Sequence, residues 1–255
     1  MKFTDFYARF EKMIPKKYAC SWDNDGLMCA SDMTSEVRRV LCTLDVTDEA
    51  LSYASEHGFD TILSHHPLIF RPLGAVTSAQ NVSRNVIFAI EKRIRVLSYH
   101  TRFDAMPGGM NDLLADALGL QHVESFGDGE SDMGRVGNLR QEVEIDAFCE
   151  TIKAALGAPF VLLSAAGAKA KRVAVLGGEG KDFISSALET GADTFVSGSL
   201  GYHHMIEAPE RGITLIEAGH YFTENLICSY FSRQVNLMDP DIVCETFSSN
   251  RIVLK

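Results

Sequence analysis

Residues 61–67, Thr-Ile-Leu-Ser-His-His-Pro, are the most informative stretch of this sequence. The first four residues predict a short buried strand, and two adjacent histidines follow where the strand ends before a proline. Two further predicted strands also run into a histidine: residues 94–99 precede His100, and residues 213–217 precede His220. Because the carboxyl ends of parallel strands line the ligand crevice of an open α/β sheet, we expect these histidines to share a site.

Around this stretch the chain alternates predicted strands and helices, an order that indicates sheets flanked by helices. The predicted helices cover residues 3–14, 48–56, 82–94, 111–119, 146–156, 183–189 and 220–231. The predicted strands cover residues 37–46, 61–64, 94–99, 171–176, 194–196, 213–217 and 242–247. The fold class is therefore α/β.

A polar, glycine-rich stretch at residues 127–137 is the expected boundary between two domains. We predict a first α/β domain from residues 1–126 plus 232–255 and a second from residues 127–231. A chain of 255 residues has room for one large domain or two small ones.

The composition narrows the class of protein. A formal net charge of −10 repels phosphate backbones, so we expect no bulk nucleic-acid binding. A nucleotide can still bind where metal ions supply local positive charge.

The predicted location is the cytoplasm. The N-terminus leads straight into an amphipathic pattern without a signal peptide, and no apolar run approaches the roughly 20 residues that cross a bilayer, so we expect no membrane association. The six cysteines form no C-x-x-C pair; they are interpreted as small buried hydrophobic residues in the reduced cytosol.

The histidines come with carboxylates at matching spacing. Asp104 follows His100, and Glu224 follows His220, each by four residues, a spacing that puts both groups on one helix face. Adjacent histidines on a regular strand point to opposite sides, so the 65–66 pair favours two ions over one.

We therefore hypothesise a pair of divalent cations. His65 and Asp104 would hold one ion, His66 and His220 the other, and Glu224 would bridge them. A nitrogen and oxygen ligand set without thiolates suits Zn, Mn, Fe or Mg and does not choose among them.

Several neighbouring features leave alternatives open. His203-His204 competes as a metal pair but has no carboxylate four residues on, so it is interpreted as substrate-facing or as plain surface. Residues 177–180, Gly-Gly-Glu-Gly, lack the phosphate-loop pattern and favour a tight turn. Trp22 fits either a core position or the wall of a site. Asp45 ends a predicted strand and could reach the crevice, without an identifiable partner.

The sequence resembles the Nif-three-like family, whose members are often described as GTP cyclohydrolase type 2-like. The resemblance covers nearly the whole chain. Its motifs here are Trp-Asp-Asn-Asp-Gly-Leu at 22–27, Ser-His-His-Pro-Leu-Ile-Phe at 64–70, His-Thr-Arg-Phe-Asp at 100–104, Gly-Gly-Met-Asn-Asp at 108–112 and Gly-His-Tyr-Phe-Thr-Glu at 219–224. The chain departs from the family at Arg102-Phe103, where Asn-Leu is common, and at Ser199, where an acidic residue is common.

The resemblance implies two α/β domains with mixed sheets flanked by helices and a dimetal site in the crevice between them. It implies the same five ligands, and a ring-shaped homohexamer. The resulting hypothesis is a dinuclear metal-dependent hydrolase of a nucleotide-like substrate, for example one opening the purine ring of GTP, with His100 or His203 as proton shuttle. The alternatives are a non-catalytic metal-binding regulatory or scaffold protein and, more weakly, a phosphoesterase.

Overall fold

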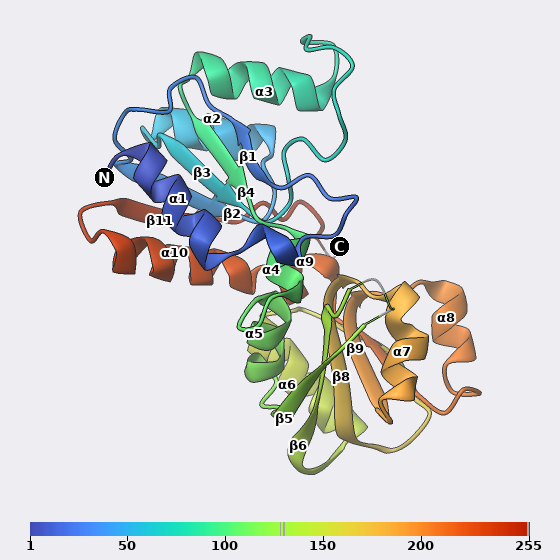
Figure 1. Ribbon diagram of the computed structural model, residues 1–255. Coiled ribbons are helices and arrows are strands. Elements are labelled where there is room, and N and C mark those ends of the chain that lie inside the picture. Colours follow the sequence, from blue (N-terminus) through green and yellow to red (C-terminus); the bar gives the residue numbers. More distant parts are fainter. Residues whose placement is uncertain (128, 130, 254) are drawn as a thin grey trace. The chain divides into compact units, whose positions relative to one another are not determined.

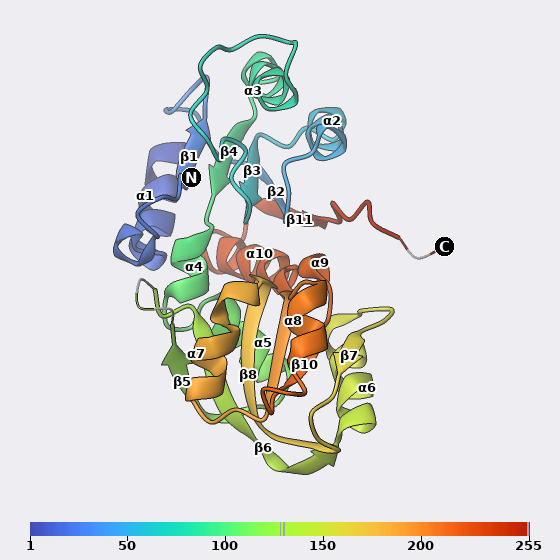
Figure 2. The ribbon, with the colours of Figure 1, turned by 90° about the vertical axis from the view of Figure 1, so that its right-hand side faces the viewer.

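The computed structural model describes residues 1–127, 129, 131–253 and 255. The chain divides into two compact units. The first comprises residues 1–103 and 227–253, and the second is formed mainly by residues 104–226. Each unit is a mixed β-sheet with helices on both faces (Figures 1 and 2).

The first unit is built on a five-stranded sheet of order β1-β4-β3-β2-β11. Strands β2, β3, β4 and β11 run parallel, and β1 is antiparallel to β4. The strands are β1 (Gly26–Cys29), β2 (Arg39–Thr43), β3 (Thr61–Ser64), β4 (Arg95–Ser98) and β11 (Val243–Phe247). The three central parallel strands are almost entirely buried, as expected for a sheet covered on both faces.

Two pairs of helices cover this sheet (Figure 1). Helices α2 (Asp48–Glu56) and α3 (Asn81–Glu91) follow β2 and β3 and pack on an aliphatic layer that includes Leu41, Ile62 and Val96. Helices α1 (Phe3–Met13) and α10 (Leu226–Met238) lie on the other face, where Phe10 stacks on Tyr99 and Phe231 packs edge-on against both rings. A short 3-10 helix, η1 (Lys16–Tyr18), follows α1, and α4 (Thr101–Ala105) follows β4.

The second unit holds a six-stranded sheet of order β5-β6-β8-β9-β10-β7. Strands β8, β9 and β10 run parallel, and the other pairings among the described residues are antiparallel. The strands are β5 (Gln121–Phe126), β6 (Gly134–Glu144), β7 (Leu162–Ser164), β8 (Lys169–Glu179), β9 (Thr194–Ser199) and β10 (Thr214–Glu217). The helices are α5 (Met110–Ala117), α6 (Ile145–Leu156), η2 (Lys181–Phe183), α7 (Ile184–Glu189), α8 (Tyr202–Glu207) and α9 (His220–Glu224). The core under α7 includes Phe183, Phe195 and Leu215.

The predicted architecture of two mixed, helix-flanked sheets is confirmed. The main local difference concerns the stretch at residues 127–137, expected as the boundary between two domains. Asp128 and Glu130 lie outside the described residues, but Gly134 to Gly137 open strand β6. A Cβ at Gly134 would lie 2.3 Å from the Phe126 ring, so this glycine allows an aromatic side chain to pack on the strand.

The limits of the two units also differ from the boundaries drawn on the sequence, which were residues 1–126 plus 232–255 and residues 127–231. Residues 104–126 group with the second unit, because β5 pairs with β6 and α5 packs on β6 and β8. The helix expected over 220–231 is divided at Asn225 into α9 and α10. None of the helices in the described part of the chain combines the length and the apolar character needed to span a bilayer.

Arg135 links strand β6 to the turns around α5, and this buried cation yields a test of the second unit. Its guanidinium donates to Asp112 at 2.8 Å and to the carbonyls of Ala105 and Met106. We expect Arg135→Met to lower the free energy of unfolding by about 3 kcal/mol, because the substitution removes the ion-pair partner of Asp112 and the side-chain donor to the carbonyls of Ala105 and Met106. Chemical denaturation measures the change.

The matched control is Lys169→Met, which removes a cation from an exposed ion pair with Glu142 in the same unit. Its cost should stay within about 1 kcal/mol. Equal losses in the two variants would show that the Arg135 network does not hold the unit together.

Candidate metal centre

Three imidazoles meet in the first unit at the carboxyl ends of neighbouring strands. Thr43, Ser64 and Ser98 pair in register across β2, β3 and β4. This register sets where the residues that follow each strand lie. His66 and His100 each lie two residues beyond their strand's member of that row, so the sheet delivers them to the same edge.

His65 joins the other two histidines. One ring nitrogen from each of His65, His66 and His100 lies within 4.8 Å of the others. The ring centroids of His65 and His66 are only 5.1 Å apart, because strand β3 ends at Ser64 and the alternation of a regular strand no longer separates them. The two adjacent histidines therefore converge on one cluster.

Every histidine of this cluster makes a hydrogen bond through Nδ1. His65 Nδ1 lies 2.8 Å from the Tyr99 carbonyl, His66 Nδ1 lies 2.7 Å from Asp45 Oδ1, and His100 Nδ1 lies 2.9 Å from Asp23 Oδ1. A carbonyl or carboxylate oxygen accepts, so each Nδ1 carries the proton and donates it. In the neutral ring the lone pair is then on Nε2, the atom that would bind a metal.

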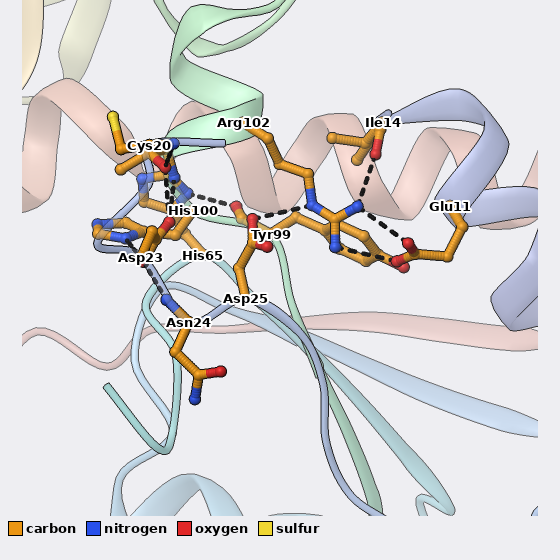
Figure 3. Close-up of polar contacts among 11 residues, drawn as sticks. Glu11, Ile14, Cys20, Asp23, Asn24, Asp25, His65, Tyr99, His100 and Arg102 are labelled. Atoms are coloured by element: carbon orange, nitrogen blue, oxygen red, sulfur yellow. Dashed lines mark hydrogen bonds and ion pairs between the residues drawn. The ribbon is translucent and has the colours of Figure 1, made fainter. Parts of the chain in front are cut away.

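Asp23 is the most strongly engaged of these acceptors (Figure 3). Besides His100, it accepts hydrogen bonds from the backbone N–H and the hydroxyl of Thr101. Burial raises the pKa of the Asp23 carboxyl, but the hydrogen bonds from His100 and Thr101 outweigh it and lower the pKa to about 2. Asp23 therefore stays ionised as an acceptor near neutral pH.

An ion-pair network holds the segment that carries Asp23 (Figure 3). Arg102 is buried and donates to Asp25 at 2.9 Å, to both carboxylate oxygens of Glu11 and to the Ile14 carbonyl. The guanidinium thus ties helix α1 to the loop two residues beyond Asp23. Arg102, one of the departures from the family pattern, supports the orientation of His100 through this loop.

The second unit contributes a histidine and a carboxylate on one short helix. His220 begins α9 and Glu224 ends it, and His220 Nε2 lies 2.9 Å from Glu224 Oε2. Glu224 is buried, whereas the His220 side chain is 46% exposed. The predicted four-residue spacing therefore places both groups on one helix face, within reach of a common ion.

Glycines allow α9 to lie close to the sheet of the second unit. A Cβ at Gly178 would lie 2.2 Å from Glu224 Oε1, and one at Gly198 would lie 2.6 Å from the Thr223 hydroxyl. Gly178 also adopts a φ of +68°, a conformation that favours glycine. The Gly-Gly of residues 177–178 thus belongs to β8 rather than to a turn, and it makes room for the carboxylate.

Asn111 is a further buried residue of this region. Its side chain donates to the Asp104 carbonyl at 3.2 Å and accepts from the Gly177 backbone N–H at 2.7 Å. Asn111 thereby connects the end of α4, where Asp104 lies, to strand β8.

The remaining predicted residues fall as follows. His203 is exposed in the first turn of α8, with its ring against Tyr202, and His204 is half-buried beside it. The set of five ligands draws on both units, and it stays a prediction, as do the roles of His100 and His203.

A divalent cation fits the donors of the first unit on chemical grounds. Three imidazoles with oriented Nε2 atoms are a preferred nitrogen set for zinc, iron and similar ions. Each imidazole has the outer acceptor on Nδ1 that metal-bound histidines usually have. Sequence reasoning identified all three histidines, but it missed Asp23 and left Asp45 without a partner.

Comparisons with known proteins identify the family of the chain. The family model for Duf34/NIF3 (NGG1p interacting factor 3) matches residues 1–251. The chain therefore belongs to the Duf34/NIF3 family, which confirms the resemblance seen in the motifs.

Relatives and solved structures support this membership. Two relatives are each named GTP cyclohydrolase 1 type 2 homolog. The protein of Clostridium perfringens is 31% identical, over 95% of this chain and 94% of that one. The protein of Lactococcus lactis is 34% identical, over 89% of both chains. Hypothetical protein SA1388 of Staphylococcus aureus is similar with a TM-score of 0.89 and 25% identity, over 100% of this chain and 99% of that one. Reduced HcgD from Methanocaldococcus jannaschii has a TM-score of 0.85 and 26% identity, over 96% and 97% of the two chains.

The outer acceptors can be tested through metal affinity. Asp45→Ala removes the acceptor of His66 Nδ1 and frees the ring to change tautomer. We expect zinc affinity to fall by about 10- to 100-fold, the usual effect of losing an outer-shell partner. Competition with a chromophoric chelator measures it, and Asp241→Ala, at an exposed carboxylate, serves as the control. Equal zinc affinities in the two variants would contradict the role of Asp45 as the acceptor that orients His66.

The close approach at Gly178 gives a separate test in the second unit. Gly178→Ala should displace the Glu224 carboxylate. Gly191→Ala is the control, because Gly191 has a similar φ of +78° and a Cβ there would meet nothing within 4 Å. Both variants should lose about 1 kcal/mol of stability through backbone strain. Only Gly178→Ala should also weaken metal binding, as measured by calorimetry. A metal affinity that falls equally in both would show that strain alone is responsible.

Proposed function

We propose that this protein is a metal-dependent hydrolase that acts on a nucleotide-like substrate. The observation that carries the proposal is the cluster of His65, His66 and His100, each oriented through Nδ1 so that Nε2 presents its lone pair. Histidines that bind a metal through Nε2 usually donate the Nδ1 proton to a carboxylate or carbonyl in this way.

The full proposal involves two divalent ions, of Zn, Mn, Fe or Mg. Their ligands would be His65 and Asp104, then His66 and His220, with Glu224 shared. When bound, such ions supply Lewis-acid chemistry for hydrolysis at neutral pH. The names of the relatives, GTP cyclohydrolase 1 type 2 homolog, support a purine nucleotide as the substrate.

The chain's own residues would then orient the site and move protons. Asp23 holds His100 at Nδ1, so His100 would exchange a proton, or bind an ion, only at Nε2. Asp45 restricts His66 in the same way. His203 is the second proposed proton shuttle, from its exposed position on α8. A homohexameric ring, which the family resemblance implies, is the proposed assembly, and analytical ultracentrifugation would test it.

Turnover by metal-loaded protein tests the catalytic proposal. Purified protein loaded with zinc or manganese would be assayed against a nucleotide panel that includes GTP, and against a phosphodiester for phosphoesterase activity. We expect ring opening of a purine nucleotide above the rate with free metal. Binding without turnover of any compound would instead support the regulatory or scaffold alternative.

Two separate histidine substitutions, one inside the cluster and one outside it, are the matched variants for this assay. His66→Ala should lower turnover by at least about 100-fold, since a lost ligand costs more than a lost outer-shell partner. His57→Ala removes a histidine that is exposed after α2, and turnover should stay at the wild-type rate. Asp104→Ala should abolish turnover in a folded oligomer. Undiminished rates in His66→Ala and Asp104→Ala would exclude the mechanism.

A further inference from the structure

Two aromatic side chains beside the histidine cluster are exposed. Trp22 is 55% exposed and Phe70 is 42% exposed. Their ring centroids are 6.0 Å apart, with planes at 77°. Trp22 is therefore no core residue, although the sequence allowed that interpretation. Aromatic side chains are enriched at interfaces, and contiguous exposed apolar patches are typical of ligand-binding grooves.

His100 supplies a third ring to this surface. Its imidazole lies 6.3 Å from the Trp22 ring at 73° and 6.0 Å from the Phe70 ring at 85°, between centroids. Three rings that are nearly perpendicular to one another form a corner, which we call the aromatic corner (Trp22, Phe70 and His100). One wall of this corner belongs to the candidate metal centre.

The aromatic corner is held in place by polar contacts outside its rings. The Asn24 side chain donates to the Ile69 carbonyl, which joins the loop after Trp22 to the segment before Phe70. Asp23, next to Trp22, holds both His100 and the backbone of Thr101 (Figure 3). Because both loops are fixed before a ligand arrives, binding would order little of the chain.

We propose that the aromatic corner binds a planar heteroaromatic ring of the substrate, stacked on Trp22 with one edge toward His100. The inference rests on the proposed function, because it treats the imidazole wall as part of the reaction site. The protein carries a net charge of −10, so phosphate groups contribute little attraction away from metal ions. Stacking on indole adds affinity that does not depend on charge.

The geometry favours a flat, neutral ring over other occupants. A ring stacked on Trp22 meets Phe70 edge-on, the arrangement that aromatic pairs prefer. A cationic group could also contact the aromatic faces. It would be repelled by divalent ions bound at the neighbouring histidines.

Trp22 is the only tryptophan of the chain, so its fluorescence reports on the corner directly. Guanosine monophosphate would be titrated into the full-length protein, with and without zinc, under excitation where guanine absorbs little. We expect saturable quenching by guanosine monophosphate and none by ribose 5-phosphate, which lacks the base. Unchanged emission, or equal quenching by both compounds, would overturn the inference.

Variants separate stacking from metal binding. By calorimetry on zinc-loaded protein, Trp22→Leu should weaken guanosine monophosphate binding by about tenfold, and Trp22→Phe should keep it within about threefold of wild type. Phe160→Leu removes an exposed aromatic side chain of the second unit and should have no effect. Wild-type affinity in Trp22→Leu would contradict the inference.

Zinc affinity, measured on the same variants, distinguishes failure of the aromatic-corner proposal from failure of the proposed function. It should be unchanged in Trp22→Leu, because indole offers no ligand to the ion. Intact zinc binding and turnover without base-dependent quenching would reject the aromatic corner alone. Base-dependent quenching in the wild type, together with weaker guanosine monophosphate binding by calorimetry in Trp22→Leu, would support the corner and reject the hydrolase if the protein shows no turnover.

Discussion

The hydrogen bonds at Nδ1 of three histidines are the constraint on which the site depends. An imidazole can bind a cation only through a nitrogen that carries a lone pair, and the partner of the other nitrogen selects which one that is. In this protein a backbone carbonyl, Asp45 and Asp23 make that selection for His65, His66 and His100. The outer acceptors therefore determine the chemistry of the cluster as much as the histidines do.

The fold supplies these acceptors from three different places. Tyr99 and Asp45 follow strands of the same sheet as the histidines, whereas Asp23 comes from the loop before β1. That loop is fixed by the buried Arg102, through Asp25 and helix α1. Burial raises the pKa of Asp25, and the Arg102 guanidinium opposes this effect. Removal of Arg102 would therefore leave a buried carboxylate without its counter-charge and destabilise the fold.

Much of this arrangement could be predicted from local sequence. Strands β3 and β4 are short buried runs that end in histidines, and such runs are recognisable without a structure. The four-residue spacing of His220 and Glu224 likewise fixes their helical geometry. The architecture of two mixed sheets came from the order of elements and from the family motifs.

The rest depends on contacts between segments that are far apart in sequence. Asp45 could be seen at a strand end, but its partnership with His66 requires the register of Thr43 with Ser64 across β2 and β3. Asp23 lies 77 residues before His100, and no local pattern connects them. Strand β6 was missed because Gly134 and Gly137 resemble a linker, although their missing side chains permit close packing on the sheet.

The tautomeric state of these rings in solution tests the Nδ1 hydrogen bonds without a variant. Long-range nitrogen–proton NMR correlations of histidine-labelled, metal-free protein distinguish protonated Nδ1 from protonated Nε2. We expect the Nδ1–H form for His65, His66 and His100, with Nε2 resonances that shift when zinc is added. Nε2–H tautomers in the free protein, or ring resonances that zinc leaves unchanged, would contradict it.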